Sequence, residues 1–285
     1  HDLIKSFENS ESHTLLLSSE YFFYLVQDIA TKMPSAQFIA YVRCPLDTFE
    51  SSYNQSVKRH GRTESAIFSQ NLHTTTLNIL NDMINVVGRK RFILRAYLPT
   101  GDTEFDLVED FACSCNLPLP KLGKTVTNSS YTFEALEFKR WLNQFKLLDF
   151  ESSIDQALQA YQKGTPTFSF LPEALSVRYQ KQALHTVRDF VQNHKVANGR
   201  RLIQYLKNRP LVECKEQSLS NAQLTEIGGY LAEYYPVLFN NILQNLKKAN
   251  IKSIECRDRV ALLDSVRTKK YSLLSKLKTI FLRKN

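Results

Sequence analysis

The stretch FIAYVRCPLDTFESSYNQSVKRHG, residues 38–61, decides how this chain folds. It begins with an apolar run rich in branched and aromatic side chains, as in a strand that is covered on both faces of a parallel sheet. The run ends at Arg43, and Pro45 then supplies the backbone angle of a first helical residue. Apolar residues follow at helical spacing, at Leu46, Phe49, Tyr53 and Val57. The sequence therefore predicts a strand that passes directly into a helix, with Arg43 at the carboxyl end of the strand.

Two further apolar runs, residues 14–19 and 91–97, are predicted to be parallel strands, and segments with helical spacing separate the runs. This alternation is typical of an α/β fold, a parallel sheet flanked by helices. From about residue 130 the pattern predicts only helices. We therefore expect an α/β core in residues 1–150 and a helical extension in residues 151–285, although these helices can equally pack as part of the same domain.

Proline residues and a capping motif set the limits of several helices in the second half. Pro172 predicts the start of a helix that runs to about His194. Ser220, with Gln223 three residues later, forms a capping box. Pro236 should kink or split the helix that begins there.

The net charge of +9 at pH 7 is concentrated at the end of the chain. From Arg257 onward nine Lys and Arg residues face two Asp residues, which gives a net charge of +7 in that segment. A helix predicted over residues 257–281 can pack on the domain with its lysines in solvent, lie on an anionic membrane surface, or grip an acidic glycan. Nucleic acid is not expected as a partner, because no nucleic-acid-binding motif accompanies the charge.

Other features of the sequence exclude several classes of protein. No apolar run is long enough to span a bilayer, and residues 1–14 lack the apolar core of a signal peptide. The five cysteines fit no zinc pattern, and Cys113 and Cys115 are predicted to be buried thiols. No pair of histidines has metal-ligand spacing, so we expect no metal. These observations predict a cytoplasmic protein in a reducing compartment, with membrane association left open.

The chemistry is predicted to lie at Arg43. In open α/β sheets, ligands bind at the carboxyl edge of the strands. Asp47 favours the first turn of the helix that follows, and Ser51 falls about two turns into it. A guanidinium and a hydroxyl that face the same crevice suit a phosphate monoester.

The pattern R-x-P-x-D-x-x-x-S resembles the 3′-phosphate-binding motif of sulfotransferases that use 3′-phosphoadenosine 5′-phosphosulfate (PAPS). Residue type and spacing both match at Arg43, Pro45, Asp47 and Ser51. Further segments look similar to bacterial, carbohydrate-modifying members of the family: residues 15–22, 50–61, 92–97, 108–117 and 127–143. The resemblance spans roughly residues 14–145 at low overall identity.

This resemblance implies a P-loop-type parallel sheet core and PAPS as the cofactor, with Arg43 and Ser51 on its 3′-phosphate. It further implies transfer of a sulfuryl group to a hydroxyl of a carbohydrate or glycan. The family's 5′-phosphosulfate loop, a Lys- and Thr/Ser-rich turn, is not found in the sequence, and we expect it to lie upstream of His1. The alternatives are a non-catalytic module that binds nucleotide or glycan, and another P-loop transferase such as a kinase.

The remaining candidates of the site follow from their places along the chain. Glu20 lies just past the first predicted strand, where the resemblance places a carboxylate base; it can also simply open the next helix. Tyr53, Gln55 and Lys58 belong to the helix after Arg43 and are expected to contact the nucleotide or the acceptor. Core packing is the alternative for Tyr53.

Arg95 and Tyr97 end the third predicted strand and are expected to point into the same crevice as Arg43. Arg95 can contact substrate or cofactor there, or it can form a structural ion pair.

Overall fold

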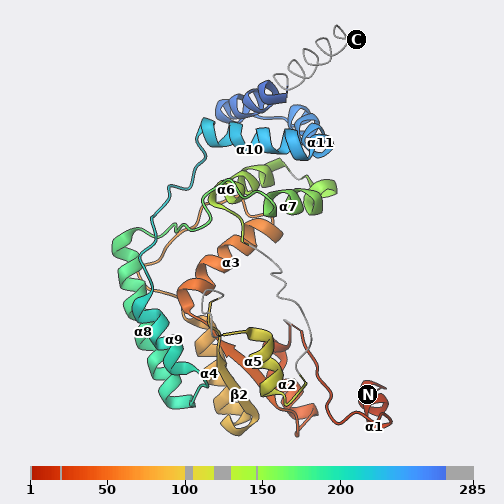
Figure 1. Cartoon of the computed structure of the whole chain (residues 1–285), viewed down its shortest axis with the longest axis vertical. Helices are drawn as coiled ribbons and strands as arrows, with labels where there is room; N and C mark the ends of the chain where they lie inside the picture. Colours follow the sequence, from red (N-terminus) through yellow and green to blue (C-terminus); the bar gives the residue numbers. More distant parts are fainter. Residues whose placement is uncertain (1, 20, 100–104, 119–129, 146, 268–285) are drawn as a thin grey trace, which may run out of the picture. The chain divides into compact units, whose positions relative to one another are not determined.

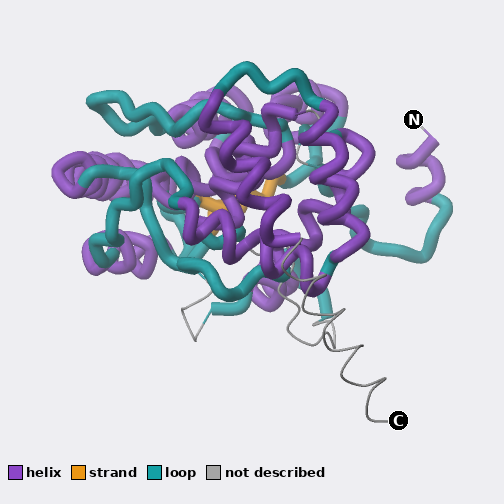
Figure 2. The backbone as a smooth tube through the Cα atoms, turned by 90° about the horizontal axis from the view of Figure 1, so that it is seen from above, coloured by secondary structure: helices purple, strands orange, loops and turns teal. Residues whose placement is uncertain are grey.

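The computed structural model describes residues 2–19, 21–99, 105–118, 130–145 and 147–267 (Figure 1). It confirms a mixed α/β structure that is rich in helix and contains a parallel sheet of two strands. In Figure 2, short orange strands interrupt a chain that is otherwise helix and loop.

The chain divides into two compact units, each assembled from three segments. The first, the sheet unit, comprises His1–Arg43, Thr74–Leu117 and Thr186–Gln204. The second, the helical unit, comprises Cys44–His73, Pro118–His185 and Tyr205–Asn285. Both units draw on both halves of the sequence, whereas the expected division was a single boundary near residue 150.

The sheet unit contains β1 (Phe38–Val42) and β2 (Phe92–Ala96), which pair in parallel with Tyr41 opposite Arg95. A third parallel segment, which the sequence did not predict, lies on the other side of β2 at Ala197. The Ala197 amide donates to the carbonyl of Leu94 at 2.9 Å, and the Ala96 amide donates to the carbonyl of Ala197 at 2.9 Å.

The predicted strand at residues 14–19 is wrong, because this stretch has no regular structure. Its side chains Leu16 and Leu17 are 48% and 37% exposed. A buried strand needs a neighbour that satisfies its backbone groups, and the described residues provide no strand partner for this one.

The described residues of the same unit include four helices and a 3₁₀ turn. Their bounds are α1 (Asp2–Glu8), α2 (Phe22–Lys32), α4 (Thr75–Val87), the 3₁₀ turn η1 (Arg89–Arg91) and α5 (Leu107–Ser114). Arg91 ties the end of α2 to the start of β2, because its guanidinium donates to the carbonyls of Ala30, Met33 and Ala36. Two helices, α8 (Glu173–His194) and α9 (Gly199–Asn208), contribute residues to both units.

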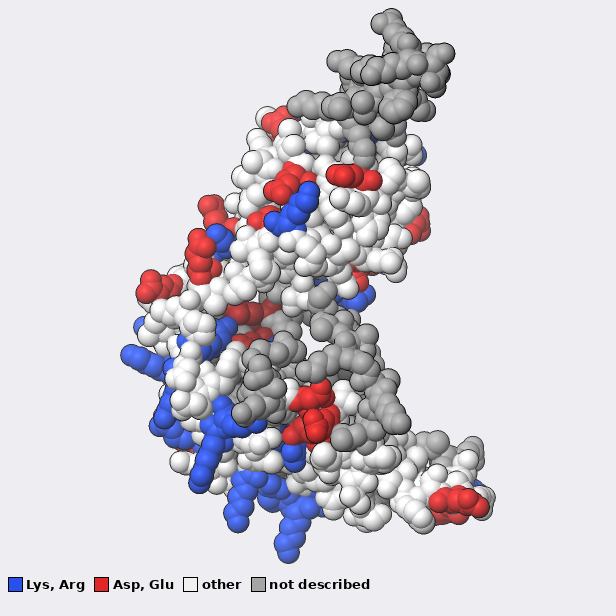
Figure 3. All heavy atoms as spheres, in the orientation of Figure 1, with Lys and Arg blue, Asp and Glu red and all other residues white. Residues whose placement is uncertain are grey.

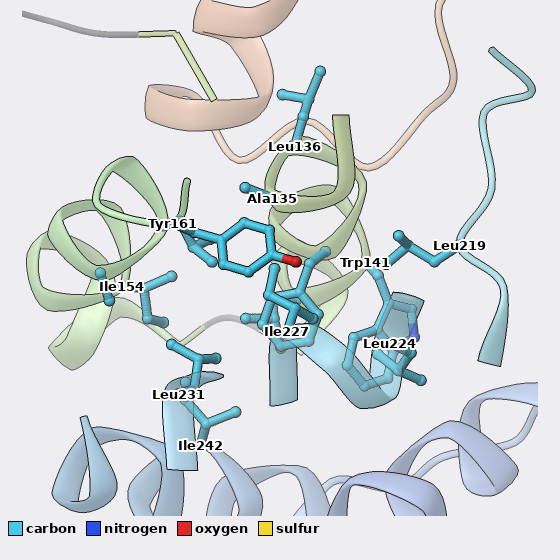
Figure 4. Packing of buried hydrophobic residues seen from close by; sticks show 14 of the residues in the cluster. Ala135, Leu136, Trp141, Ile154, Tyr161, Leu219, Leu224, Ile227, Leu231 and Ile242 are labelled. Atoms are coloured by element: carbon cyan, nitrogen blue, oxygen red, sulfur yellow. The ribbon is translucent and has the colours of Figure 1, made fainter. Parts of the chain in front are cut away.

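The helical unit is built around α6 (Phe133–Leu142), in which every residue except Arg140 is buried. The other elements are α3 (Pro45–Arg59), η2 (Asn143–Phe145), η3 (Leu148–Phe150), α7 (Glu151–Gln159), α10 (Asn221–Tyr234) and α11 (Pro236–Lys248). Helices α3, α7 and α10 all pack against α6. In Figure 4, Tyr161 and Ile227 lie among the side chains that fill this core.

The local signals for helix ends are confirmed. Helix α8 begins directly after Pro172 and ends at His194. Ser220 and Gln223 form the predicted capping box, and Pro236 separates α10 from α11. The last helix is described over residues 254–267, and the rest of its predicted length lies outside the described residues.

Among the described residues, no helix combines the length and apolar character that crossing a bilayer requires.

Candidate anion-binding site at the sheet edge

The junction between strand and helix forms as the sequence predicts. Strand β1 ends at Val42, and α3 begins at Pro45, so that only Arg43 and Cys44 connect them. Arg43 is therefore at the carboxyl end of a parallel strand, and its side chain is exposed.

Tyr97 holds the Arg43 side chain from the neighbouring strand. The Arg43 guanidinium carbon lies 5.2 Å from the centre of the Tyr97 ring, a cation–π contact. The Tyr97 amide donates to the carbonyl of Val42 at 2.9 Å, which ties the ends of the two strands together. Phe105 packs edge-on against the Tyr97 ring, with centroids 6.5 Å apart. Arg43 thus rests on an aromatic surface that is itself anchored.

Within the described part of the chain, no carboxylate pairs with Arg43. An exposed guanidinium held on an aromatic ring keeps its fork of donors available for a phosphate or a carboxylate. On the face drawn in Figure 3, Lys and Arg side chains gather over the region of α4, α8 and α9. The geometry of Arg43, exposed and held on the Tyr97 ring, favours an anionic ligand.

Arg95 is engaged in a structural ion pair, the second of the two roles that the sequence left open. Its Nε and Nη2 atoms donate to the two carboxylate oxygens of Asp110. Tyr41 donates its hydroxyl to Oδ2 of Asp110 at 2.8 Å, and Asn198 donates its amide nitrogen to Oδ1 at 3.2 Å. All donors of Arg95 that face Asp110 are therefore occupied, which leaves Arg43 as the better ligand for an anion.

The pKa values of this cluster follow from burial and hydrogen bonding. Burial opposes ionisation of Asp110, but the hydrogen bonds from Arg95 and Tyr41 outweigh it, and the pKa of Asp110 lies below its ordinary value. Burial and the bond to Asp110 both raise the pKa of Tyr41. The carboxylate is therefore charged and the tyrosine is a neutral donor at neutral pH.

The candidates on α3 fall into two groups. Ser51 and Gln55 are exposed in the helical unit, where a ligand could reach them. Tyr53 is buried against Phe170, and Lys58 is buried with its ammonium 5.0 Å from the centre of the Tyr131 ring. Their burial favours packing over ligand contact.

Glu20, the expected catalytic base, lies outside the described residues.

Asp47 of the R-x-P-x-D-x-x-x-S pattern is committed to a network within the helical unit. It accepts hydrogen bonds from the Tyr205 hydroxyl at 2.9 Å and from Nε of Arg209 at 3.1 Å. The other arm of Arg209 donates to Glu50, which also accepts from the hydroxyl of Ser169. Burial raises the pKa of Glu50 despite these bonds. Asp47 therefore fixes the first turn of α3.

The prediction that Cys113 and Cys115 are buried is wrong, because Cys113 is exposed and Cys115 is half-buried.

Sequence reasoning missed Asp110, Asn198 and Arg209. Asp110 and Arg209 have no local signature, because their partners lie far away along the chain. Asn198 carried a usable signal, since Asn before Gly marks a turn, and its φ of 58° is in the left-handed region that Asn tolerates.

Comparison of the chain with models of protein families, with curated proteins and with solved structures finds no match.

Proposed function

We propose that the chain is a PAPS-dependent sulfotransferase that sulfates a hydroxyl of a carbohydrate or glycan. The observation that carries the proposal is the state of Arg43. It is exposed, it lies at the carboxyl end of β1 just before a helix that begins with proline, and it is paired with no carboxylate among the described residues. The resemblance of the R-x-P-x-D-x-x-x-S pattern to the sulfotransferase motif adds the identity of the ligand.

In this proposal Arg43 binds the 3′-phosphate of the nucleotide. A phosphate monoester presents several acceptor oxygens to a guanidinium fork, and such charge-assisted bonds are stronger than neutral ones. Tyr97 keeps the fork in place through its ring. The Ser51 hydroxyl is the second ligand that the resemblance implies.

The reaction moves a sulfuryl group between two oxygens. The acceptor hydroxyl oxygen forms a bond to sulfur while the bond from sulfur to the 5′-phosphate oxygen breaks, and adenosine 3′,5′-bisphosphate leaves. The hydroxyl proton passes to a base, the role proposed for Glu20. Positive charge must stabilise the departing phosphate oxygen, which is the task of the family's phosphosulfate loop. A P-loop-type core is part of this proposal.

A non-catalytic module that binds nucleotide or glycan is the second candidate. The sequence favours it in one respect, because no Lys- and Thr/Ser-rich loop for the 5′-phosphosulfate is found in it. Such a module would keep the Arg43 site and bind adenosine 3′,5′-bisphosphate without transferring sulfate.

Thermal unfolding with adenosine 3′,5′-bisphosphate tests the site. A ligand at 100 times its Kd stabilises the folded protein by about 2.7 kcal/mol, so the Tm should rise. Arg43→Ala should raise the Kd by roughly 10- to 150-fold, since a hydrogen bond to a charged group contributes about 1.5–3 kcal/mol. The matched control is Arg188→Ala, which removes an exposed arginine of α8 in the same unit and should keep the full rise.

Two further measurements separate the candidate functions. Radiolabelled PAPS with a panel of oligosaccharides should yield labelled product if the chain is an enzyme, and none if it is a binding module. ATP should compete poorly with adenosine bisphosphate, because it lacks a 3′-phosphate; equal competition would favour a kinase-like protein. Absence of any Tm rise in the folded, unsubstituted protein rejects the site.

A further inference from the structure

The carboxylate of Asp110 connects four elements of the sheet unit. Each of its oxygens accepts from two donors, which come from Tyr41 on β1, Arg95 on β2 and Asn198 after the third parallel segment. Asp110 itself belongs to α5. One side chain thus bridges all three parallel segments and the helix that covers them.

The register of the sheet places this bridge directly behind the candidate site. Tyr41 is opposite Arg95, and Arg95 is bridged to Ala197, so the three segments meet in one row, each about 4.8 Å from the next. Side chains two positions apart on a strand point to the same face. Arg43 and Tyr97 therefore form the next row on the face that carries Tyr41 and Arg95.

We propose that Asp110 is a positioning residue that presets Arg43 and Tyr97 for the anion. Neither of these two side chains bonds to Asp110; it acts through the backbone of the strands that carry them. An exposed arginine loses conformational freedom when it binds, and a fixed sheet edge reduces that cost. The inference rests on the proposed function, and it adds a residue to the site that the sequence motif does not contain.

Asp110→Asn is the variant that tests the proposal. An amide nitrogen replaces one acceptor oxygen, so two of the four donors lose their acceptor. We expect the Kd for adenosine 3′,5′-bisphosphate to rise by about 10- to 100-fold, by analogy with the loss of metal affinity when the outer partners of metal-binding residues are removed. The Kd for adenosine 5′-monophosphate, which lacks the 3′-phosphate, should change little. The measurement is therefore the Kd for adenosine 5′-monophosphate divided by the Kd for adenosine 3′,5′-bisphosphate, and this ratio should fall in Asp110→Asn.

Asp106→Ala is the matched control on the same helix. Asp106 caps α5 by accepting from the amides of Val108 and Glu109, so its loss destabilises α5 but leaves the Asp110 carboxylate in place. The ratio of Kd values should be preserved in this variant. An equal fall in both variants would show that only the stability of α5 matters, and it would overturn the proposal. Should Asp110→Asn fail to fold, Tyr41→Phe removes a single donor and should lower the ratio in the same direction.

Amide hydrogen exchange in the free protein tests, without any nucleotide, whether Asp110 fixes the sheet edge. Asp110→Asn should speed exchange at Tyr97 and Ala197, on the order of tenfold, through local opening of the sheet edge. The Gly88 amide, which ends α4, should exchange at its normal rate. If the unsubstituted protein binds neither nucleotide, the proposed function fails, and exchange alone then decides whether Asp110 fixes the edge. Unchanged exchange at Tyr97 and Ala197 would show that Asp110 does not fix the sheet edge, whether or not the protein binds nucleotide, and it would overturn the proposal.

Discussion

Two cations of the molecule, Lys58 in the helical unit and Arg43 in the sheet unit, differ in their surroundings. In the helical unit, Asp155 and Lys58 are both buried and lie within ion-pair distance of each other. In the sheet unit, Arg95 has the same kind of partner in Asp110, but Arg43 rests on an aromatic ring with no carboxylate among the described residues. Lys58 and Arg95 are paired with carboxylates and stabilise the fold, whereas the guanidinium of Arg43 is available to a ligand.

Lys58 requires a partner because it is buried. A buried charge loses its hydration, and only a partner of opposite charge with good hydrogen bonds compensates for that loss. The carboxylate of Asp155 is well compensated. It accepts hydrogen bonds from Tyr131 and Gln159, forms an ion pair with Arg59 and lies near Lys58. Burial lowers the pKa of Lys58, and Asp155 opposes that shift.

The largest effect is therefore expected from Asp155→Asn. The substitution removes the negative charge from a buried cluster that retains Lys58, and breaking such a cluster costs about 3–5 kcal/mol of unfolding free energy. Urea unfolding followed by circular dichroism measures the loss. Asp258→Asn changes an exposed aspartate in the same unit and should have almost no effect. Similar losses in the two variants would contradict the distinction between paired core charges and surface charges.

The sequence predicted those features that depend on a few neighbouring residues. The passage from β1 to α3, the strand β2, the capping box at Ser220 and the break at Pro236 all follow from local patterns. The exposed position of Arg43 follows from the same logic, because it is the first residue after the strand.

Features that depend on distant partners could not be predicted. Arg95 and Asp110 are fifteen residues apart, but Tyr41 and Asn198 reach the same carboxylate from 69 and 88 residues away. No local pattern indicates that Ala197 joins the sheet. The prediction of a strand at residues 14–19 is wrong for a related reason. Their composition suits a strand, but a strand also needs a partner, and composition does not reveal whether one is present.

A smaller effect, this time within the sheet unit, is expected from pH. Burial and then the charge of Arg89 lower the pKa of His194 below its ordinary value of 6.5, and its Nε2 atom lies 2.8 Å from Oδ1 of Asn81. Because the folded protein binds this proton less readily than the unfolded chain, the contribution of His194 is present above pH 6.5 and is lost as the pH falls through the folded pKa. Unfolding free energies measured between pH 7 and pH 5 should fall less steeply in His194→Gln. Parallel curves for the two proteins would show that His194 is not the group responsible.

The smallest effect on stability is expected from Arg43→Ala in the absence of ligand. A cation–π contact at an exposed site contributes about 0.5–1 kcal/mol, and Arg43 makes no ion pair among the described residues that its loss would break. Urea unfolding should therefore place this variant within about 1 kcal/mol of the unsubstituted protein, while the nucleotide-dependent rise in Tm becomes much smaller. A loss as large as that of Asp155→Asn would assign Arg43 to the fold. A small loss of stability combined with a much smaller response to the nucleotide would instead assign Arg43 to ligand binding.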